Sequence, residues 1–86
     1  MATWTLTITE AHSTHTQHGT AATRADAATE ILRAARETVH GIDSSARYTF
    51  DMDGGTAAIL QTYPDEHGQP NPAATLELLD RIEGTL

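Results

Sequence analysis

Three histidines at every third position come nearest to a chemical motif in this sequence. His12, His15 and His18 lie in the segment 10–22, which otherwise consists largely of Ala, Ser, Thr, Gln and Gly. If this segment coiled, the three imidazoles would lie within about 120° of one another, close enough to share a divalent metal ion. A mobile polar loop provides no second shell to orient such ligands. The segment therefore predicts either a metal site at His12, His15 and His18 or a solvated loop.

Two aspartates beside glycines are a second candidate. Asp51 and Asp53 precede Gly54, as carboxylates do in a calcium loop, but the third oxygen position is Gly55 and Thr62 stands where the bidentate glutamate belongs. The calcium motif therefore fails. At a hairpin tip the two carboxylates should also be solvated, which leaves them untuned for acid–base chemistry.

A further ionisable cluster lies between two predicted elements. Asp65, Glu66 and His67 are adjacent in a turn-rich loop. They could lend ligands to a metal held by the first histidine segment, or form an ordinary solvated loop. The sequence is compatible with both interpretations.

No catalytic nucleophile is recognisable. The chain has no cysteine, and its serines, Ser13, Ser44 and Ser45, lie in no nucleophile motif. It also has no P-loop, no dinucleotide-binding glycine motif and no His-Glu-x-x-His zinc motif. We therefore name no catalytic residue and expect no cofactor.

Composition limits the class of partner. Five arginines and no lysine face twelve acids, for a net charge of −7, which argues against a nucleic-acid partner because that affinity comes from basic side chains. The chain is short enough for one domain, residues 1–86. It opens with no secretory pattern and has no apolar run long enough to span a membrane, so we expect a cytoplasmic protein with no membrane contact.

The elements that must position these residues are organised around one amphipathic helix. Within residues 23–40, Thr23 can cap the first turn and Gly41 is placed to end the helix. One arc of the helix is apolar, and the opposite arc is polar. The apolar arc is predicted to be core and contains Ala27, Ala28, Ile31, Leu32, Ala34, Ala35, Thr38 and Val39.

Alternation of apolar and polar residues predicts strands at 4–8, 46–53 and 56–63. The Asp53-Gly54-Gly55 run predicts a hairpin between the last two strands. A two-residue turn would place Ala57 and Ile59 on the face of Phe50, whereas a three-residue loop would place Ala58 and Leu60 there.

A second helix is predicted from Asn71, as its cap, to Gly84. Its apolar arc is wider than that of the first helix. We expect it to be core, although an edge left uncovered would be an oligomer contact. The residues of this arc are Leu76, Leu78, Leu79, Ile82 and Leu86.

These elements predict an α+β fold in the order β-α-β-β-α, a two-layer sandwich with two helices on one face of a three-stranded sheet. A right-handed crossover would join the first two strands. The other face, which carries the threonines at 3, 5, 7 and 9, would be open. The leading hypothesis is a non-catalytic, self-associating protein interaction module, a homodimer with a possible further protein partner. The alternative is a divalent-metal binder or small hydrolase that uses the histidine segment.

Overall fold

The structure, a computed structural model, describes residues 1–41, 45–69 and 71–86. Four strands, two helices and one short 3-10 helix follow one another along these residues. Their order and bounds are β1 (Ala2–Thr9), β2 (Thr14–Ala21), α1 (Arg24–Thr38), η1 (Val39–Gly41), β3 (Arg47–Met52), β4 (Gly55–Gln61) and α2 (Pro72–Glu83). The α+β class and the two helices are as predicted.

The predicted three-stranded sheet and the β-α-β-β-α order are wrong by one strand. The segment read as a loop after Glu10 contains β2, which pairs antiparallel with β1 along its whole length, from Ala2 opposite Ala21 to Thr9 opposite Thr14. The strand order is β2-β1-β3-β4, and all neighbours are antiparallel. The sequence pattern does not reveal β2 because the strand has no large apolar residue, although three of its four outward positions, 14, 16 and 20, are threonine.

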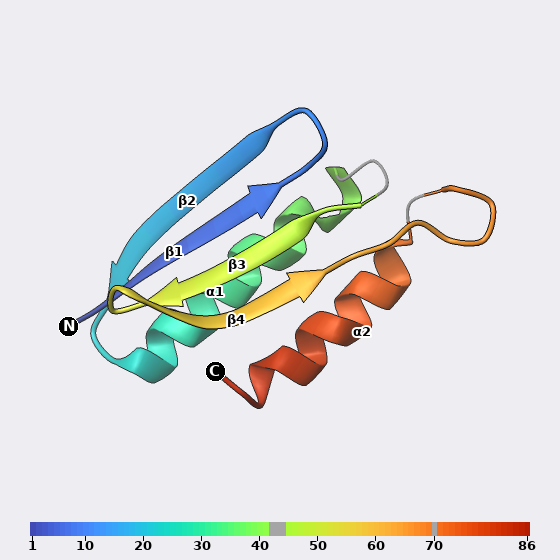
Figure 1. Cartoon of the computed structure of the whole chain (residues 1–86). Helices are drawn as coiled ribbons and strands as arrows, with labels where there is room; N and C mark the ends of the chain where they lie inside the picture. Colours follow the sequence, from blue (N-terminus) through green and yellow to red (C-terminus); the bar gives the residue numbers. More distant parts are fainter. Residues whose placement is uncertain (42–44, 70) are drawn as a thin grey trace.

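The additional strand also changes the connection through α1. The first two predicted strands, now β1 and β3, pair antiparallel and are not joined by a crossover. Instead α1 connects β2 to β3, which flank β1 and therefore run parallel to each other. Figure 1 shows the resulting two layers, with α1 behind β1 and β3 and the other face of the sheet open.

The core lies between the sheet and α1. One face of each of β1 and β3 supplies large buried side chains, and α1 covers them with a stripe rich in alanine, which brings its backbone close to the sheet. The largest fully buried side chains are Leu6, Ile8, Ile31, Leu32, Tyr48, Phe50 and Leu79.

Helix α1 begins as predicted and ends differently. The hydroxyl of Thr23 accepts a hydrogen bond from the Asp26 amide at 3.1 Å, and the predicted apolar arc is buried except for the half-buried Thr38. At the other end the chain tightens into η1, and Gly41 does not adopt the positive φ expected of a helix-terminating glycine. The sequence also predicts that Ile42 continues the apolar arc beyond Gly41, and this residue lies outside the described part of the chain.

The hairpin between β3 and β4 combines features of both predicted alternatives. Its turn has two residues, Asp53 and Gly54, with φ of 53° and 84°, as in a type I′ turn. A bulge beside Phe50 then inserts one extra residue in β4, so that Ala58 is its partner. As a result Leu60 faces the core and Ile59 faces the open side.

Helix α2 also begins as predicted, with the Asn71 side chain accepting from the Ala74 amide at 3.3 Å and Pro72 in the first turn. It packs on α1 and η1, with little direct contact with the strands. Of its apolar arc only Leu79 is fully buried, and the other members are partly exposed. The expectation that the whole arc is core is therefore only partly met.

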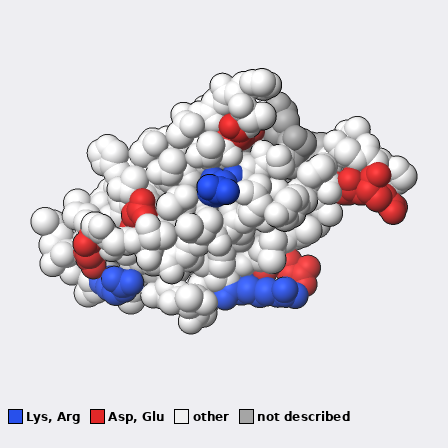
Figure 2. Space-filling model, viewed as in Figure 1, with Lys and Arg blue, Asp and Glu red and all other residues white. Residues whose placement is uncertain are grey.

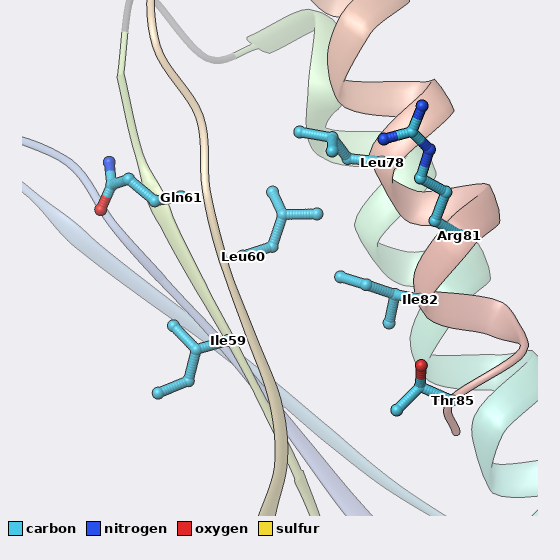
Figure 3. A pocket seen from close by; sticks show the side chains of 7 residues that line it. All are labelled: Ile59, Leu60, Gln61, Leu78, Arg81, Ile82 and Thr85. Carbon is cyan, nitrogen blue, oxygen red and sulfur yellow. The ribbon is translucent and has the colours of Figure 1, made fainter.

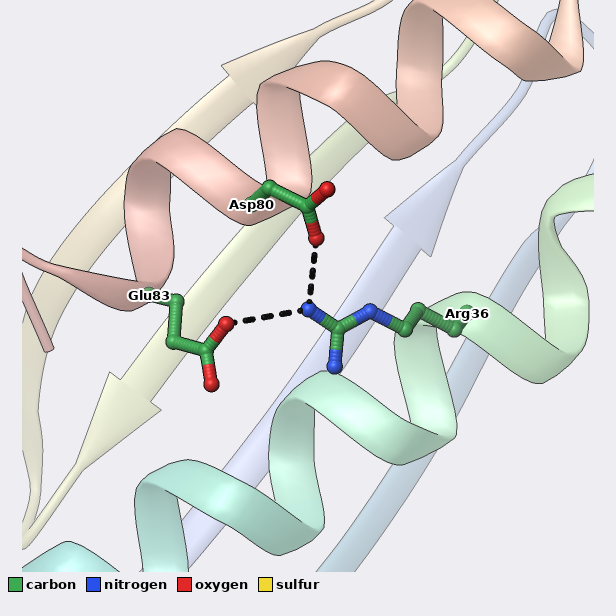
Figure 4. Close-up of polar contacts among 3 residues, drawn as sticks. All are labelled: Arg36, Asp80 and Glu83. Carbon is green, nitrogen blue, oxygen red and sulfur yellow. Dashed lines mark hydrogen bonds and ion pairs between the residues drawn. The ribbon is translucent and has the colours of Figure 1, made fainter.

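One arginine bridges the two helices. Arg36 of α1 donates from Nη2 to Asp80 Oδ1 at 2.9 Å and to Glu83 Oε2 at 3.2 Å, both on α2 (Figure 4). The hydrogen bond with Asp80 is the main cause of the raised pKa of Arg36.

None of the described helices is long and apolar enough to cross a membrane.

Candidate functional site

The predicted metal ligands are not brought together. His12 lies in the bend between β1 and β2, His15 is opposite Ile8 on the helix-facing side, and His18 is opposite Thr5 on the open side. His15 and His18 thus point to opposite faces of one strand, because side chains alternate along it. The part of the chain that the structure describes contains no group of three His, Asp or Glu residues that could hold a metal ion.

The two aspartates of the β3–β4 hairpin have structural partners. Asp53 accepts from the Thr3 amide at 3.0 Å through Oδ1 and lies 3.5 Å from Arg24 through Oδ2. Asp51 accepts from the Thr56 hydroxyl at 2.8 Å. These contacts tie the hairpin to the start of β1 and α1, so the carboxylates have an evident role in the fold.

A serine, a histidine and a glutamate meet at the β1–β2 turn. Ser13 donates from Oγ to Glu10 Oε2 at 3.1 Å, and His15 Nε2 lies 3.5 Å from the same Oγ and 3.6 Å from the same Oε2. In a catalytic triad the nucleophile and the carboxylate contact opposite nitrogens of the imidazole. Here both oxygens approach one nitrogen, so the arrangement does not support the hydrolase alternative.

The open face of the sheet is rich in threonine and poor in charge. The predicted row at 3, 5, 7 and 9 is joined by outward residues of the neighbouring strands, which the register aligns with it. These are Thr14, Thr16, His18 and Thr20 of β2, Arg47, Thr49 and Asp51 of β3, and Ile59 and Gln61 of β4. Figure 2 looks onto this side and shows mostly uncharged surface, with one basic group near its middle and acidic groups nearer its margins.

An apolar groove lies between β4 and α2. It is a cavity of about 320 Å³ lined by Ile59, Leu60, Gln61, Leu78, Arg81, Ile82 and Thr85. In Figure 3 the side chains of Leu60, Leu78 and Ile82 converge in the space between the strand and the helix, while Ile59 and Gln61 point to the other side of β4. The groove exists because α2 packs on α1 and leaves the end of the sheet uncovered.

β4 is also an unpaired edge of the sheet. The Thr62 amide donates to the Ala46 carbonyl at 2.9 Å. This bond determines which residues of β4 direct their backbone N–H groups toward β3. Because paired and unpaired positions alternate in antiparallel strands, the N–H of Ile59 is directed away from β3. Every residue of β4 is uncharged, and Ile59 is 61% exposed. This edge lacks the charges and prolines that commonly protect edge strands.

We name the outer edge of β4 together with the groove the β4–α2 surface. Sequence reasoning placed Leu78 and Ile82 correctly on one arc of α2 and did not show that the arc would be incompletely covered. The feature of the sequence that could have indicated an uncovered surface here is the length of the uncharged strand after Gly54.

Comparison with known proteins found no matching family model, no matching curated protein and no matching solved structure.

Proposed function

We propose that the protein is a non-catalytic interaction module that self-associates through the β4–α2 surface. The observation that carries the proposal is the coincidence of an uncharged free strand edge with exposed Ile59 and an apolar groove beside it. Edge pairing would satisfy backbone groups such as the Ile59 N–H, and the groove would lose its contact with water.

The other edge of the sheet is the weaker candidate. β2 is uncharged as well when its histidines are neutral, but Ala21 is its only apolar side chain. Pairing there would form main-chain hydrogen bonds and bury little apolar surface. β4 offers both, through Ile59, Leu60 and the adjoining residues of α2.

Pairing of two copies through β4 is consistent with symmetry and charge. An antiparallel β4–β4 contact is self-complementary about a twofold axis. With a net charge of −7 on each copy, the uncharged β4 strand is a place where two copies can approach without juxtaposing like charges.

The area that a stable interface buries determines which elements must take part in the contact. A stable interface buries about 800 Å² on each partner, which is roughly one sixth of the 5143 Å² surface of the chain. Strand pairing alone would not reach this area, so the exposed arc of α2 must take part. We therefore include Leu78 and Ile82 in the proposed contact.

Sedimentation of the wild type at tens of micromolar tests the proposal, with a dimer expected. Ile59→Lys places a charge on the free edge of β4 without removing a buried side chain, so the variant should fold and sediment as a monomer. Thr16→Lys is the matched control, because it adds the same charge on the open face at the opposite edge and should leave the dimer intact.

A wild-type monomer at this concentration would refute self-association. A dimer that resists Ile59→Lys but is split by the double change Thr5→Lys and Thr7→Lys would instead place the contact on the open face. Circular dichroism of each variant shows that a change in assembly is not a consequence of unfolding.

A further inference from the structure

Only a short stretch of the free β4 edge is suited to regular pairing with another strand. At one end lies the bulge beside Phe50, where Ala57 is the extra residue of β4. A bulge bends its strand and interrupts the ladder, so regular pairing begins beyond it. The first residue there whose N–H is directed away from β3 is Ile59. At the other end Pro64 has no N–H to donate, so the usable edge is 59–63.

This stretch runs two residues past the end of β4, and the chain keeps the form of a strand there. Thr62 is 4% exposed and lies between the partly exposed Gln61 and Tyr63, which is 72% exposed, so the alternation of the strand continues. The Ala46 amide also donates to the Thr62 hydroxyl at 2.9 Å, which holds this part of the chain beside the start of β3. Tyr63 precedes Pro64, a position that favours extended backbone. Figure 1 shows the chain continuing in the direction of β4 beyond its arrowhead.

The outward backbone groups of this stretch match those of an antiparallel partner. Because the Thr62 N–H is directed to β3, alternation directs the N–H groups of Ile59, Gln61 and Tyr63 away from it. Their carbonyl groups lie on the same side. The usable edge therefore offers three evenly spaced donor and acceptor positions, with Gln61 in the middle.

Symmetry determines how two such edges can pair. An antiparallel contact between two identical segments has its twofold axis at the midpoint of the paired stretch. The midpoint of 59–63 is Gln61. We propose, on the basis of the self-association proposed above, that two copies pair through this stretch with Gln61 on the twofold axis. Ile59 of each copy is then opposite Tyr63 of the other copy.

This register brings exposed apolar side chains together. Among the described residues, the large apolar side chains that are mostly exposed are those of Met1, Ile59 and Tyr63. Two of these three lie on the usable edge, four residues apart, and therefore on the same face of the strand. Aromatic and β-branched side chains form favourable cross-strand pairs. The register forms the Ile59–Tyr63 pair twice, once on each side of the axis.

Charge and the groove are compatible with the same register. Residues 59–63 carry no charge, so each of them meets an uncharged residue of the other copy. Ile59 and Gln61 point away from the groove (Figure 3), and their partners do the same, so both grooves lie on one side of the joined sheet. Leu78 and Ile82 of the two copies can then add to the contact beside the strands.

Other registers use less of the edge. With Ile59 on the axis, Gln61 would be opposite the bulged Ala57, and Tyr63 would be opposite Gly55 at the hairpin. With Leu60 on the axis, Tyr63 would be opposite Ala57. Each of these registers places a bulged residue in the ladder and leaves Ile59 without an apolar partner.

Cysteine cross-linking tests the register, because the chain has no cysteine of its own. In Gln61→Cys the two thiols would lie on residues directly opposite each other, with Cα atoms about 5.5 Å apart, which suits a disulfide. This variant should form a covalent dimer in a glutathione redox buffer at tens of micromolar. Ile59→Cys should not, because its two thiols would be about 13 Å apart along the strands. Thr16→Cys is the control for random collision, since it places a thiol on the open face of β2.

A mixed experiment keeps the test independent of the Gln61 side chain, which donates to the Ala46 and Thr62 carbonyls. Chains with Ile59→Cys and chains with Tyr63→Cys, combined in equal amounts, should form the mixed disulfide, identified by its mass. Both positions are exposed, and the second Ile59–Tyr63 pair of such a dimer is unchanged. Tyr63→Ala should weaken association of the otherwise unchanged chain several-fold, whereas Tyr63→Phe should not.

The outcomes separate this register from self-association itself. A wild-type monomer in sedimentation would refute both. If the wild type is a dimer, efficient cross-linking of Ile59→Cys with itself would move the axis to Ile59 and overturn the register. The absence of the mixed disulfide, or association of Tyr63→Ala as tight as that of the wild type, would also overturn it. Circular dichroism of each variant confirms that the fold is retained.

Discussion

Gly19 is a residue whose side chain could not be larger. It pairs with Trp4 across β1 and β2, and a Cβ at this position would lie 2.8 Å from three atoms of the indole ring. Gly19→Ala should therefore destabilise the fold by about 1–3 kcal/mol, because the buried indole has to move. Gly41→Ala, where a Cβ meets no atom of the described residues within 4 Å, should change stability by less than about 0.5 kcal/mol. Urea melts of the two variants check this, and equal losses would show that the Trp4 contact is not what requires glycine.

Tyr48 gives the fold a dependence on alkaline pH. Its pKa is raised above the ordinary value of 10.0, chiefly by burial. The stability associated with keeping this phenol neutral is complete below pH 10 and is lost as the pH rises through the higher pKa of the folded state. Between about pH 9 and about pH 11, the free energy of unfolding should thus fall more steeply for the wild type than for Tyr48→Phe. Parallel curves would contradict the assignment to Tyr48.

At the scale of elements, α1 is the best test of the core. Ile31 is fully buried and Arg33 is exposed on the opposite arc. Ile31→Asp should unfold the domain, since an unpaired buried charge costs several kcal/mol against a total stability of about 5 kcal/mol. Arg33→Ala should cost less than about 0.5 kcal/mol. Similar urea midpoints for the two variants would show that the helix is oriented differently.

The same helix shows what sequence could and could not predict. Its cap at Thr23 and its buried arc follow from local patterns of side chains. β2 offered no such pattern, because its helix-facing positions are His15, Gln17, Gly19 and Ala21, none of which is a large apolar residue. Its place in the sheet depends on β1 and on Trp4 above Gly19, which are contacts distant in sequence.

Arg36 links α1 to α2 through two ion pairs. Its contacts with Asp80 and Glu83 are partly exposed, with 36% of the Arg36 side chain accessible, so Arg36→Ala should cost only about 0.5–1 kcal/mol, and less at high salt. Arg81→Ala removes an arginine that pairs within α2 alone and is 72% exposed, and it should cost less than about 0.5 kcal/mol. Thermal melts at low and high salt measure both, and a larger loss for Arg81→Ala would contradict the bridging role.

At the scale of the whole molecule, the fold is a thin slab, with extents of 43 × 25 × 18 Å. Such a shape leaves much of its surface near the edges, and the β4–α2 surface runs along one of them. Neither the bulge beside Phe50 nor the packing of α2 on α1 could be read from local patterns. Both depend on how the elements pack together, and together they determine that Leu60 and Ile82 face a groove and that Ile59 faces solvent.

The salt dependence of assembly follows from the charge of the whole chain. Two copies of net charge −7 repel each other at long range, whereas the proposed contact at β4 contains no charged residue of the strand. Raising the salt from about 50 mM to about 500 mM shortens the screening length to a few ångströms, so the dimer should become several-fold tighter. Sedimentation at the two salt concentrations measures this, with Ile59→Lys expected to stay monomeric in both. A dimer that weakens with salt would mean that ion pairs hold it together, and it would move the contact from β4 to the charged faces of the helices.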